Sequence, residues 1–241
     1  MSSQNDISAN LKKYENLNNY SEWMFHTYSN YVGKRIFDVG AGIGRMVSYY
    51  IDQAEMVVAT DIFQNQIDYM NNRFEKYEYF KAELIDILES DLSPYESRFD
   101  TVICINVLEH LSDDFQAVNK MKSLLEPDGN LIILVPAFQK LYCDFDKNVG
   151  HYRRYEPGRL REIANENGLC VVKNHYFNMM GMIPYWLKGR IKKGKDESFS
   201  SSLNENNSSI YNFASKIMEP IERIIRPRFG LTEVMIMKKS I

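Results

Sequence analysis

Short apolar runs alternate along the chain with segments in which apolar residues recur every three or four positions. The runs predict seven strands, at residues 35–39, 56–60, 77–84, 99–105, 131–135, 169–172 and 231–237. The segments between them have the spacing of amphipathic helices. Strands that alternate with helices build a mostly parallel sheet with helices on both faces, so the pattern predicts an α/β protein.

Three helical faces are well marked in the sequence. After the second strand, Ile67, Met70 and Phe74 repeat at three and four residues. A helix is expected after the fourth strand, and it should end at the turn of residues 127–129. One face of this helix carries Phe115, Val118, Met121 and Leu125. A later helix has apolar residues at the same spacing, namely Ile210, Phe213, Ile217, Ile221 and Ile224.

The predicted elements divide the chain into a core and two additions. Residues 33–178 and 230–241 hold the strands and are expected to form the core. Residues 1–32 are expected to be a helical segment that serves as a lid. Residues 179–229 form an unusually long connection, which we expect to cover a substrate. Within it, residues 190–209 are too poor in apolar side chains to pack and predict a surface loop.

Composition and charge narrow the possible partners. The 241 residues include 29 Lys and Arg against 32 Asp and Glu, a net charge of −3, so no overall basic field exists for holding nucleic acid. Cys104, Cys143 and Cys170 form no CxxC pair, so neither a disulfide framework nor a thiolate zinc site is indicated. The first 20 residues are polar, unlike a signal peptide, and no apolar run approaches the roughly 18 residues of a membrane span. These features favour a cytoplasmic protein.

A cluster of glycines marks the turn between the first strand and the helix after it. Gly40, Gly42 and Gly44 lie within five residues, and the next glycine is Gly129. Glycine permits a tight turn and the close approach of a ligand, and the start of a helix offers unpaired N–H groups. Asp61 ends the next strand, at about the distance from Gly40 where a carboxylate binds the ribose of a bound nucleoside. The sequence therefore predicts a nucleotide-type ligand here.

The spacing of the glycines separates two classes of ligand. A dinucleotide-binding GxGxxG motif that starts at Gly40 needs glycine at position 45, where this chain has Arg45. The GxGxG spacing resembles the first motif of class I S-adenosylmethionine (SAM)-dependent methyltransferases. The resemblance extends through Asp61, residues 90–92, residues 106–110 and the turn at 127–129. It implies SAM as the cofactor and a Rossmann-like, seven-stranded, mostly parallel sheet with an antiparallel last strand.

By position, the resemblance also implies a set of cofactor-binding residues. The glycines would line the methionine part of SAM, the acid at 61 would bind the ribose, and the pair at 91 and 92 would flank the adenine. Residues 106 and 107 would lie beneath the cofactor, and the two aromatic residues before the first strand would either close a lid or pack their helix. The set is Tyr20, Trp23, Gly40, Ala41, Gly42, Gly44, Asp61, Ile62, Asp91, Leu92, Asn106 and Val107.

Two histidines lie where an acceptor would meet the cofactor. The protein must align a nucleophile with the methyl group of SAM, and a hydroxyl acceptor benefits from a histidine base. His110 follows the fourth strand, and Glu109-His110 resembles a pair that some quinone-precursor O-methyltransferases use in catalysis or metal binding. A further acid of those enzymes is absent here, with Asn106 in that region, so no metal site is predicted. His151, after the fifth strand, is the other candidate base.

The loop after the fifth strand is dense in aromatic and basic side chains. Residues 150–155, GHYRRY, resemble a stretch found in a group of uncharacterised bacterial methyltransferases. Tyr142, Tyr152, Arg153 and Arg154 are candidate acceptor-binding residues, since arginines bind carboxylate or phosphate in a forked geometry. The alternative is that the two arginines and Asp146 form an ion-pair network that holds the loop.

The predicted activity is therefore methyl transfer to a small-molecule acceptor, preferably at oxygen. Residues 179–187 are rich in Met and aromatic side chains, which suit an apolar acceptor, and the basic residues at 188–195 suit an anionic or lipid-linked one. Contact with a membrane surface is not favoured, because such basic runs are more often solvated. The alternatives are N-methylation of a small metabolite or amino sugar and a SAM-binding subunit without catalysis. Arg45 disfavours an NAD-dependent reductase, and the oligomeric state stays open.

Overall fold

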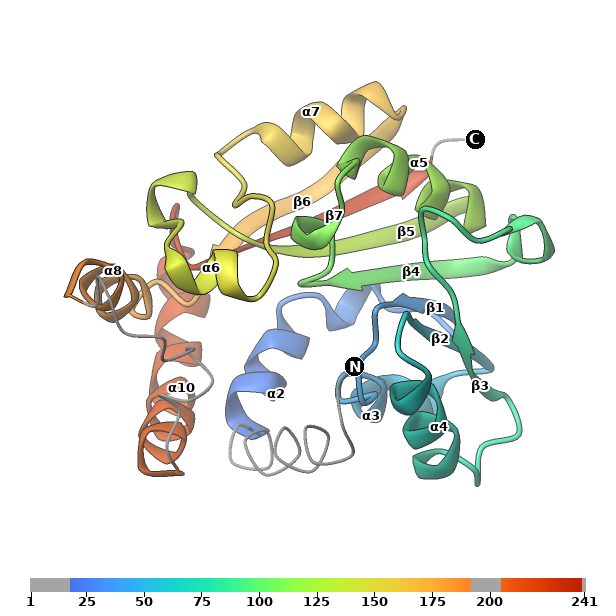
Figure 1. Cartoon of the computed structure of the whole chain (residues 1–241), viewed down its shortest axis with the longest axis horizontal. Coiled ribbons are helices and arrows are strands. Elements are labelled where there is room, and N and C mark those ends of the chain that lie inside the picture. Colours follow the sequence, from blue (N-terminus) through green and yellow to red (C-terminus); the bar gives the residue numbers. More distant parts are fainter. Residues whose placement is uncertain (1–17, 192–204, 240–241) are drawn as a thin grey trace.

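The computed structural model describes residues 18–191 and 205–239, which are built around a seven-stranded sheet (Figure 1). The order of the strands is β3-β2-β1-β4-β5-β7-β6. Neighbours from β3 to β5 are parallel, whereas β7 is antiparallel to both β5 and β6. The strands are β1 (Arg35–Val39), β2 (Met56–Asp61), β3 (Phe80–Leu84), β4 (Phe99–Ile105), β5 (Leu125–Pro136), β6 (Leu169–Phe177) and β7 (Thr232–Lys239). The predicted Rossmann-like sheet with an antiparallel last strand is confirmed.

Helices occupy most connections between the described strands. The α-helices are α2 (Asn18–His26), α3 (Val47–Tyr50), α4 (Gln64–Arg73), α5 (Asp114–Leu124), α6 (Asp144–Asn148), α7 (Arg159–Glu166), α8 (Met182–Ile191) and α10 (Glu205–Ile225). Short 3-10 helices are η1 (Ser29–Tyr31), η2 (Ile51–Gln53), η3 (Ser93–Tyr95), η4 (Leu108–His110) and η5 (Gln139–Leu141). The start of α5 follows from its sequence, because the Asp113 side chain accepts a hydrogen bond from the N–H of Gln116 at 2.9 Å.

The sheet lies between two layers of helices and buries a hydrophobic core on each face. On one face, Val118 of α5 and Ile163 of α7 are buried against the strands. On the other face, Val47 of α3 and Met70 of α4 are buried. Successive residues of a strand point to opposite faces, so the central strands contribute to both cores and read as almost continuous apolar runs.

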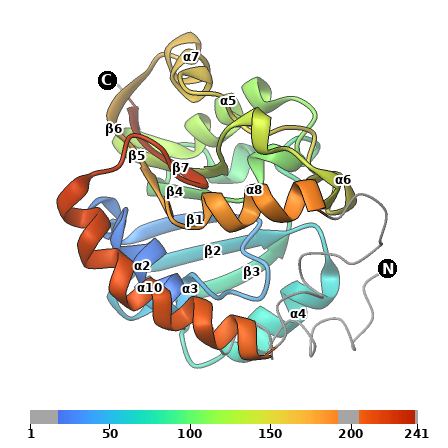
Figure 2. The same cartoon turned by 90° about the vertical axis from the view of Figure 1, so that its left-hand side faces the viewer.

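The connection from β6 to β7 leaves and re-enters the sheet at paired positions, since Phe177 lies opposite Thr232. Its helices α8 and α10 lie on the side toward which the arrowhead of β4 points (Figure 1, Figure 2). α10 packs against α2, where the N–H of Asn19 donates to Oδ1 of Asn212 at 2.7 Å. The connection therefore stands over the carboxyl ends of the parallel strands, where α/β proteins bind ligands.

Most predicted elements are present, but one predicted helix face is partly wrong. α5 ends at Leu124, so Leu125 belongs to β5 instead of the helix. Phe115 is on the exposed side of α5, whereas Val118 and Met121 are buried as expected. The helix ends one residue early because Leu125 adopts an extended conformation and begins to pair with β4.

The apolar spacing on α10 has a different outcome from that on the other helices. Phe213, Ile217 and Ile224 are exposed, so this part of the stripe faces away from the described protein. Within residues 18–191 and 205–239, no helix is long and apolar enough to cross a membrane. Residues 1–17 of the predicted lid and 192–204 of the predicted loop, with the basic residues at 192–195, lie outside the described residues. The division into a core and two additions stays a prediction.

Candidate functional site

The turn after β1 has three glycines in the left-handed backbone region. The φ angles of Gly40, Gly42 and Gly44 are +66°, +62° and +70°, which other residues rarely adopt. A Cβ on Gly40 would overlap the side chain of Val107, and a Cβ on Gly44 would overlap that of Phe74. A Cβ on Gly42 would meet nothing closer than 3.7 Å. The packing of the turn therefore requires Gly40 and Gly44, while Gly42 is where a ligand can approach the backbone.

Asp61 ends β2 directly beside this turn. Its carboxylate accepts hydrogen bonds from the N–H groups of Gly42 at 3.0 Å and Phe63 at 3.1 Å. Burial raises the pKa of Asp61, and these backbone hydrogen bonds partly offset that rise. The carboxylate thus braces the glycine turn, and each oxygen retains a lone pair that can accept from a ribose hydroxyl.

Two apolar side chains lie open at the ends of the neighbouring strands. Ile62 follows Asp61 and is 59% exposed, and Leu84, which pairs with Asp61 across the sheet, is 53% exposed. Exposed aliphatic side chains at this edge suit the flat faces of an aromatic base. Leu84 was not among the residues predicted from the sequence, although it ends β3 as Asp61 ends β2.

The structure does not bring Asp91 and Leu92 to this edge of the sheet. They precede η3, which leads into the first residue of β4, and so lie on the segment that runs back toward the opposite end of the parallel strands. Asp91 accepts hydrogen bonds from the N–H and the hydroxyl of Ser93, both at 3.0 Å, and Leu92 is buried in the core beneath α5. The geometry therefore gives no support to the adenine contacts expected of this pair, because the chain has already crossed the sheet at that point.

The segment after β4 does reach the glycine turn. Asn106 has a φ of +53°, and its N–H donates to the carbonyl of Leu134 at 2.9 Å, which turns the chain at the end of the strand. Val107 then covers Gly40. Asn106 and Val107 thus lie at the end of β4 beside the glycine turn, and their place beneath the cofactor stays a prediction.

Tyr20 and Trp23 of α2 gather around the last residue of β6. The ring of Tyr20 stacks on Phe177 with 5.9 Å between centroids, and Trp23 meets Phe177 edge to face at 5.3 Å. Trp23 is buried in the core, whereas Tyr20 is only partly buried. Helix packing accounts for Trp23, and Tyr20 is the member of the pair with an accessible surface.

A second cluster, in the loop between β5 and α7, centres on Asp146 of α6. Its Oδ1 lies 2.9 Å from Nδ1 of His151 and accepts from Nε of Arg154 at 2.8 Å. Its Oδ2 accepts from the N–H of Cys143 and the hydroxyl of Tyr185, both at 2.9 Å. Burial alone would raise the pKa of Asp146, but the hydrogen bonds from His151 and Arg154 hold it well below its ordinary value. The ionised carboxylate therefore keeps the proton on Nδ1 and leaves Nε2 of His151 to accept one.

His151 lies against the segment that follows β4. Its ring meets that of His110 edge to face, with 4.6 Å between centroids, and its Nε2 is 3.8 Å from Oε1 of Glu109. The N–H of Tyr152 donates to the carbonyl of Glu109 at 2.8 Å and ties the loop to that segment. Glu109 is buried, neither of its carboxylate oxygens has a hydrogen-bond partner among the described residues, and burial raises its pKa to about 8. Glu109 is therefore mostly uncharged at neutral pH.

Glu109, His110 and His151 also form a candidate metal-binding group. Each offers one ligand atom, and these atoms all lie within 4.8 Å of one another. Imidazole and carboxylate donors suit zinc and similar divalent cations. No metal site was predicted from the sequence, because a further acid of the quinone-precursor O-methyltransferases is absent, with Asn106 in that region. The third donor, His151, comes from a distant loop that spacing does not reveal. The prediction of no metal stays a prediction.

The two arginines of the GHYRRY stretch are both engaged in ion pairs. Arg154 is buried, bonds Asp146, and lies over the ring of Tyr185 at 4.4 Å from its centroid. Arg153, which is partly exposed, pairs with Asp114 at 3.0 Å. Arg154 and Asp146 therefore form the ion pair that the alternative interpretation expected to hold the loop. Arg153 pairs with a different acid and remains partly accessible.

The two tyrosines of the loop differ in exposure. The hydroxyl of Tyr142 donates to the carbonyl of His151 at 2.7 Å and steadies the backbone of the candidate base. Tyr152 is 62% exposed and adjoins His151 in the chain. An acceptor that approaches His151 would therefore find Tyr152 free to contact it.

Comparisons with known proteins agree with this fold. Residues 37–131 match the family model of the methyltransferase domain. An uncharacterized methyltransferase from Schizosaccharomyces pombe is 27% identical over 108 residues, 42% of this chain and 38% of that protein. A ubiquinone biosynthesis O-methyltransferase from Actinobacillus pleuropneumoniae is 26% identical over 103 residues, 41% of this chain and 44% of that protein. The matched parts thus span about two fifths of these relatives.

A solved structure extends the likeness to nearly the whole chain. The crystal structure of a SAM-dependent methyltransferase from Archaeoglobus fulgidus superposes with a TM-score of 0.61 at 18% identity and covers 92% of this chain and 95% of that one. A likeness at this identity shows the fold. Residues 37–131 thus match a methyltransferase domain, and nearly the whole chain has a Rossmann-like methyltransferase fold.

Proposed function

We propose that this protein transfers the methyl group of SAM to an oxygen atom of a small-molecule acceptor. The observation that carries the proposal is the imidazole of His151, which Asp146 holds with Nε2 toward the segment that also covers the glycine turn. A hydroxyl acceptor has to lose a proton during methylation, so it benefits from such a base. The ubiquinone biosynthesis O-methyltransferase among the relatives supports oxygen as the target.

The residues around the glycine turn fit SAM. The open face of Gly42, with Ala41 and the other two glycines, would hold the methionine part, and Asp61 would accept hydrogen bonds from the ribose. Ile62 and Leu84 would flank the adenine with the apolar surface they leave exposed. Asn106 and Val107 would form the floor. When bound, SAM supplies an activated methyl group on a sulfonium sulfur.

In the proposed reaction, His151 would remove the hydroxyl proton of the acceptor through Nε2 as the acceptor oxygen takes the methyl group. The S–CH3 bond would break, and S-adenosylhomocysteine would leave with its electron pair. Asp146 keeps Nδ1 protonated and stabilises the positive charge that the ring acquires. Glu109, 3.8 Å from Nε2, is kept mostly uncharged by burial, so it does not trap the ring in its protonated form. His110, whose pKa is lowered by burial and by the neighbouring His151, is a second neutral imidazole beside the acceptor.

Acceptor binding is assigned to the loop and to the connection from β6 to β7. Tyr142, Tyr152 and Arg153 would contact the acceptor, while Arg154 acts through Asp146. Tyr185 of α8 also bonds Asp146, which couples the apolar residues 179–187 to the base. We propose that residues 179–229 cover the acceptor, an apolar molecule with an anionic or lipid-linked part, and that the protein works in the cytoplasm.

The proposal is tested in two stages. Calorimetric titration with S-adenosylhomocysteine should give binding, and NAD and NADP should give none. Transfer of label from SAM to a panel of catechol and phenol acceptors should then be measured for the wild type, His151→Gln and Asn148→Ala, the last a control on the exposed side of the same loop. Loss of the base should reduce kcat by roughly 10²- to 10⁴-fold with little change in S-adenosylhomocysteine affinity. Full activity of His151→Gln would rule out its role as base.

A further inference from the structure

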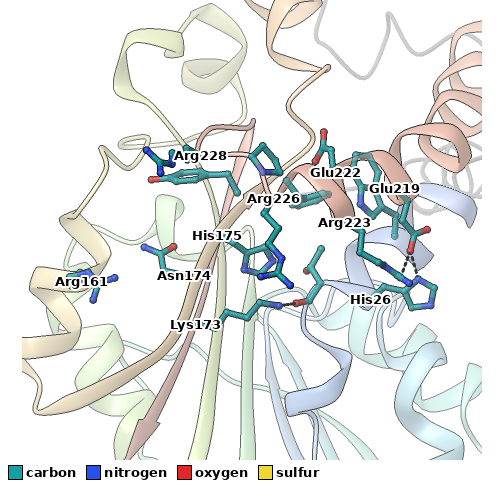
Figure 3. A pocket seen from close by; sticks show the side chains of 15 residues that line it. His26, Arg161, Lys173, Asn174, His175, Glu219, Glu222, Arg223, Arg226 and Arg228 are labelled. Carbon is teal, nitrogen blue, oxygen red and sulfur yellow. Dashed lines mark hydrogen bonds and ion pairs between the residues drawn. The ribbon is translucent and has the colours of Figure 1, made fainter.

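A cavity of about 700 Å³ lies at the outer edge of the sheet, between β6, α2 and the end of α10 (Figure 3). Neither the residues of the glycine turn nor His151 line it. β7 alone separates β6 from β5, the strand that leads into the loop of His151, which at about 4.8 Å per strand places the cavity roughly 10 Å from β5. The lining therefore differs from that of the candidate active site, and residues 219–228 are shared with the proposed acceptor cover.

The walls of the cavity carry more positive than negative charge. Its lining includes one lysine and four arginines, against the acids Glu219 and Glu222. Glu219 is already paired, with Nδ1 of His26 at 2.7 Å and with Arg223 at 2.9 Å. The carboxylate of Glu222 is buried and accepts from the N–H groups of residues 178 and 179, at 2.8 and 2.7 Å. Neither acid is free to neutralise the remaining cations.

Two of those cations face each other across the cavity floor. Lys173 of β6 donates to the carbonyl of Thr27 at 3.2 Å and forms no ion pair with a described carboxylate. The Arg226 side chain has neither a hydrogen bond nor an ion pair within the described chain. The pKa of Lys173 is lowered by burial and by the charge of Arg226, which means that two positive charges lie close together without a counter-charge.

The imidazole of His175 lies beside these two cations in the lining of the cavity. Nδ1 of His175 is buried without a hydrogen-bond partner among the described residues. Burial and the charge of Lys173 lower the pKa of His175 to about 4, so the ring is uncharged at neutral pH. Figure 3 shows Lys173, His175 and Arg226 grouped together, with Arg161 and Arg228 farther out. His175 lines the cavity, so the accessible part of its uncharged ring offers a neutral polar contact beside the two cations.

We propose that this cavity binds a molecule through a phosphate group, which Lys173 and Arg226 neutralise and His175 contacts. A phosphate ester carries close to two negative charges at neutral pH and three acceptor oxygens, which matches two cations and a neutral imidazole. The rings of Trp23 and Phe177 lie in the same wall and offer apolar surface to the rest of the ligand. A volume of about 700 Å³ suits a small organic molecule.

The test uses the intact protein and probes of defined chemistry. Glycerol 3-phosphate and inorganic pyrophosphate are titrated by calorimetry at low salt, and vesicles that contain phosphatidic acid are used in sedimentation. The variants are Lys173→Met, Arg226→Gln and Arg98→Gln, the last an exposed arginine outside the cavity as the control. Binding of at least one probe should weaken tenfold or more in the first two variants and stay unchanged in the third. S-adenosylhomocysteine binding should be the same in all four proteins.

The outcomes separate the sources of the phosphate. Binding of the soluble probes alone identifies a soluble phosphate ester, and vesicle binding that both cavity variants lose identifies a lipid headgroup. Thermal unfolding checks that the variants fold. Arg226→Gln removes no side-chain hydrogen bond or ion pair within the described chain, so it remains a test of the proposal if Lys173→Met is unstable. Absence of binding by every probe, or equal binding by the wild type and Arg226→Gln, would overturn the proposal.

Discussion

Nδ1 of His151 lies 2.9 Å from Oδ1 of Asp146, and the same oxygen accepts a hydrogen bond from Arg154. The imidazole is thus oriented by a carboxylate that is itself fixed by a buried cation. Because Arg154 also donates to the carbonyl of Ala137 at 3.4 Å, the orientation of the candidate base is set by the end of β5. The base is therefore positioned by the sheet despite its place in a loop.

Asp146→Asn should disrupt both the base and the loop. Arg154 would be left buried without its carboxylate, a change that costs about 3–5 kcal/mol in comparable buried pairs. Methyl transfer should fall with the loss of the correct tautomer of His151. Unfolding in denaturant and single-turnover rates measure the two effects. Asp144→Asn, an exposed change on the same helix, is the control and should alter neither.

The same substitution has a defined pH dependence. The pKa of Asp146 is lower in the folded protein than its ordinary value near 4, so its contribution to stability is present above that pH and is lost as the pH falls through the folded value. The difference in unfolding free energy between the wild type and Asp146→Asn should therefore shrink below about pH 4. A difference that grows on acidification would contradict the assignment of an ionised carboxylate.

Asp61→Asn should weaken cofactor binding while leaving the fold intact. The amide can still accept through one oxygen, but it lacks the charge that braces Gly42 and the second oxygen that would take a ribose hydroxyl. We expect the Kd for S-adenosylhomocysteine to rise about tenfold or more, since charged hydrogen bonds contribute about 1.5–3 kcal/mol. Asp68→Asn, an exposed change on α4, is the control. Equal affinities of the wild type and Asp61→Asn would exclude the ribose role.

Gly40→Ala and Gly42→Ala should differ in their effects. Both place a side chain at positive φ, which costs about 1 kcal/mol, but only the new Cβ at position 40 overlaps Val107. Overpacking adds about 1–3 kcal/mol, so Gly40→Ala should be the less stable protein in urea unfolding. Val107→Ala combined with Gly40→Ala should recover part of the loss. If the double variant is no more stable than Gly40→Ala, the contact with Val107 is not the cause.

Glu233→Gln should flatten the dependence of stability on pH. Burial raises the pKa of Glu233 to about 7, so the folded protein holds a proton there that the unfolded chain releases above about pH 4.5. Stability from this group is complete below pH 4.5 and is lost as the pH rises toward 7, at up to about 1.4 kcal/mol per pH unit. Unfolding free energies measured between pH 5 and 7 should decline less in Glu233→Gln. Parallel curves for the two proteins would contradict this.

The sequence predicted the sheet well because burial on both faces leaves an unmistakable signal. β1 and β4 begin and end at the predicted residues, since most of their side chains are apolar and buried. The predicted stripe on α10 is instead partly exposed, at Phe213 and Ile224 among others. Spacing identifies an apolar helix face, but it does not say what the face contacts.

The sequence allowed prediction only of those candidate site residues that lie at the carboxyl end of a strand or directly after it. Gly42, Asp61 and Val107 each end or follow a strand, so their meeting at one edge could be inferred from strand order. The adenine contact implied for Asp91 stays a prediction, because the segment that carries Asp91 leads from β3 back to the start of β4. The phosphate-binding cavity escaped prediction altogether, since Lys173 and Arg226 are drawn from elements that the linear chain does not bring together.

The pairing of Phe177 with Thr232 gives the protein a modular construction. Residues 178–231 connect two neighbouring antiparallel strands, as the loop of a hairpin does. The entropic cost of closing such a loop grows only slowly with the number of residues in it. This connection can therefore change in length and sequence during evolution without disturbing the parallel strands whose carboxyl ends would hold the cofactor. Exchange of this segment between related proteins should redirect the choice of acceptor and leave cofactor affinity as it was.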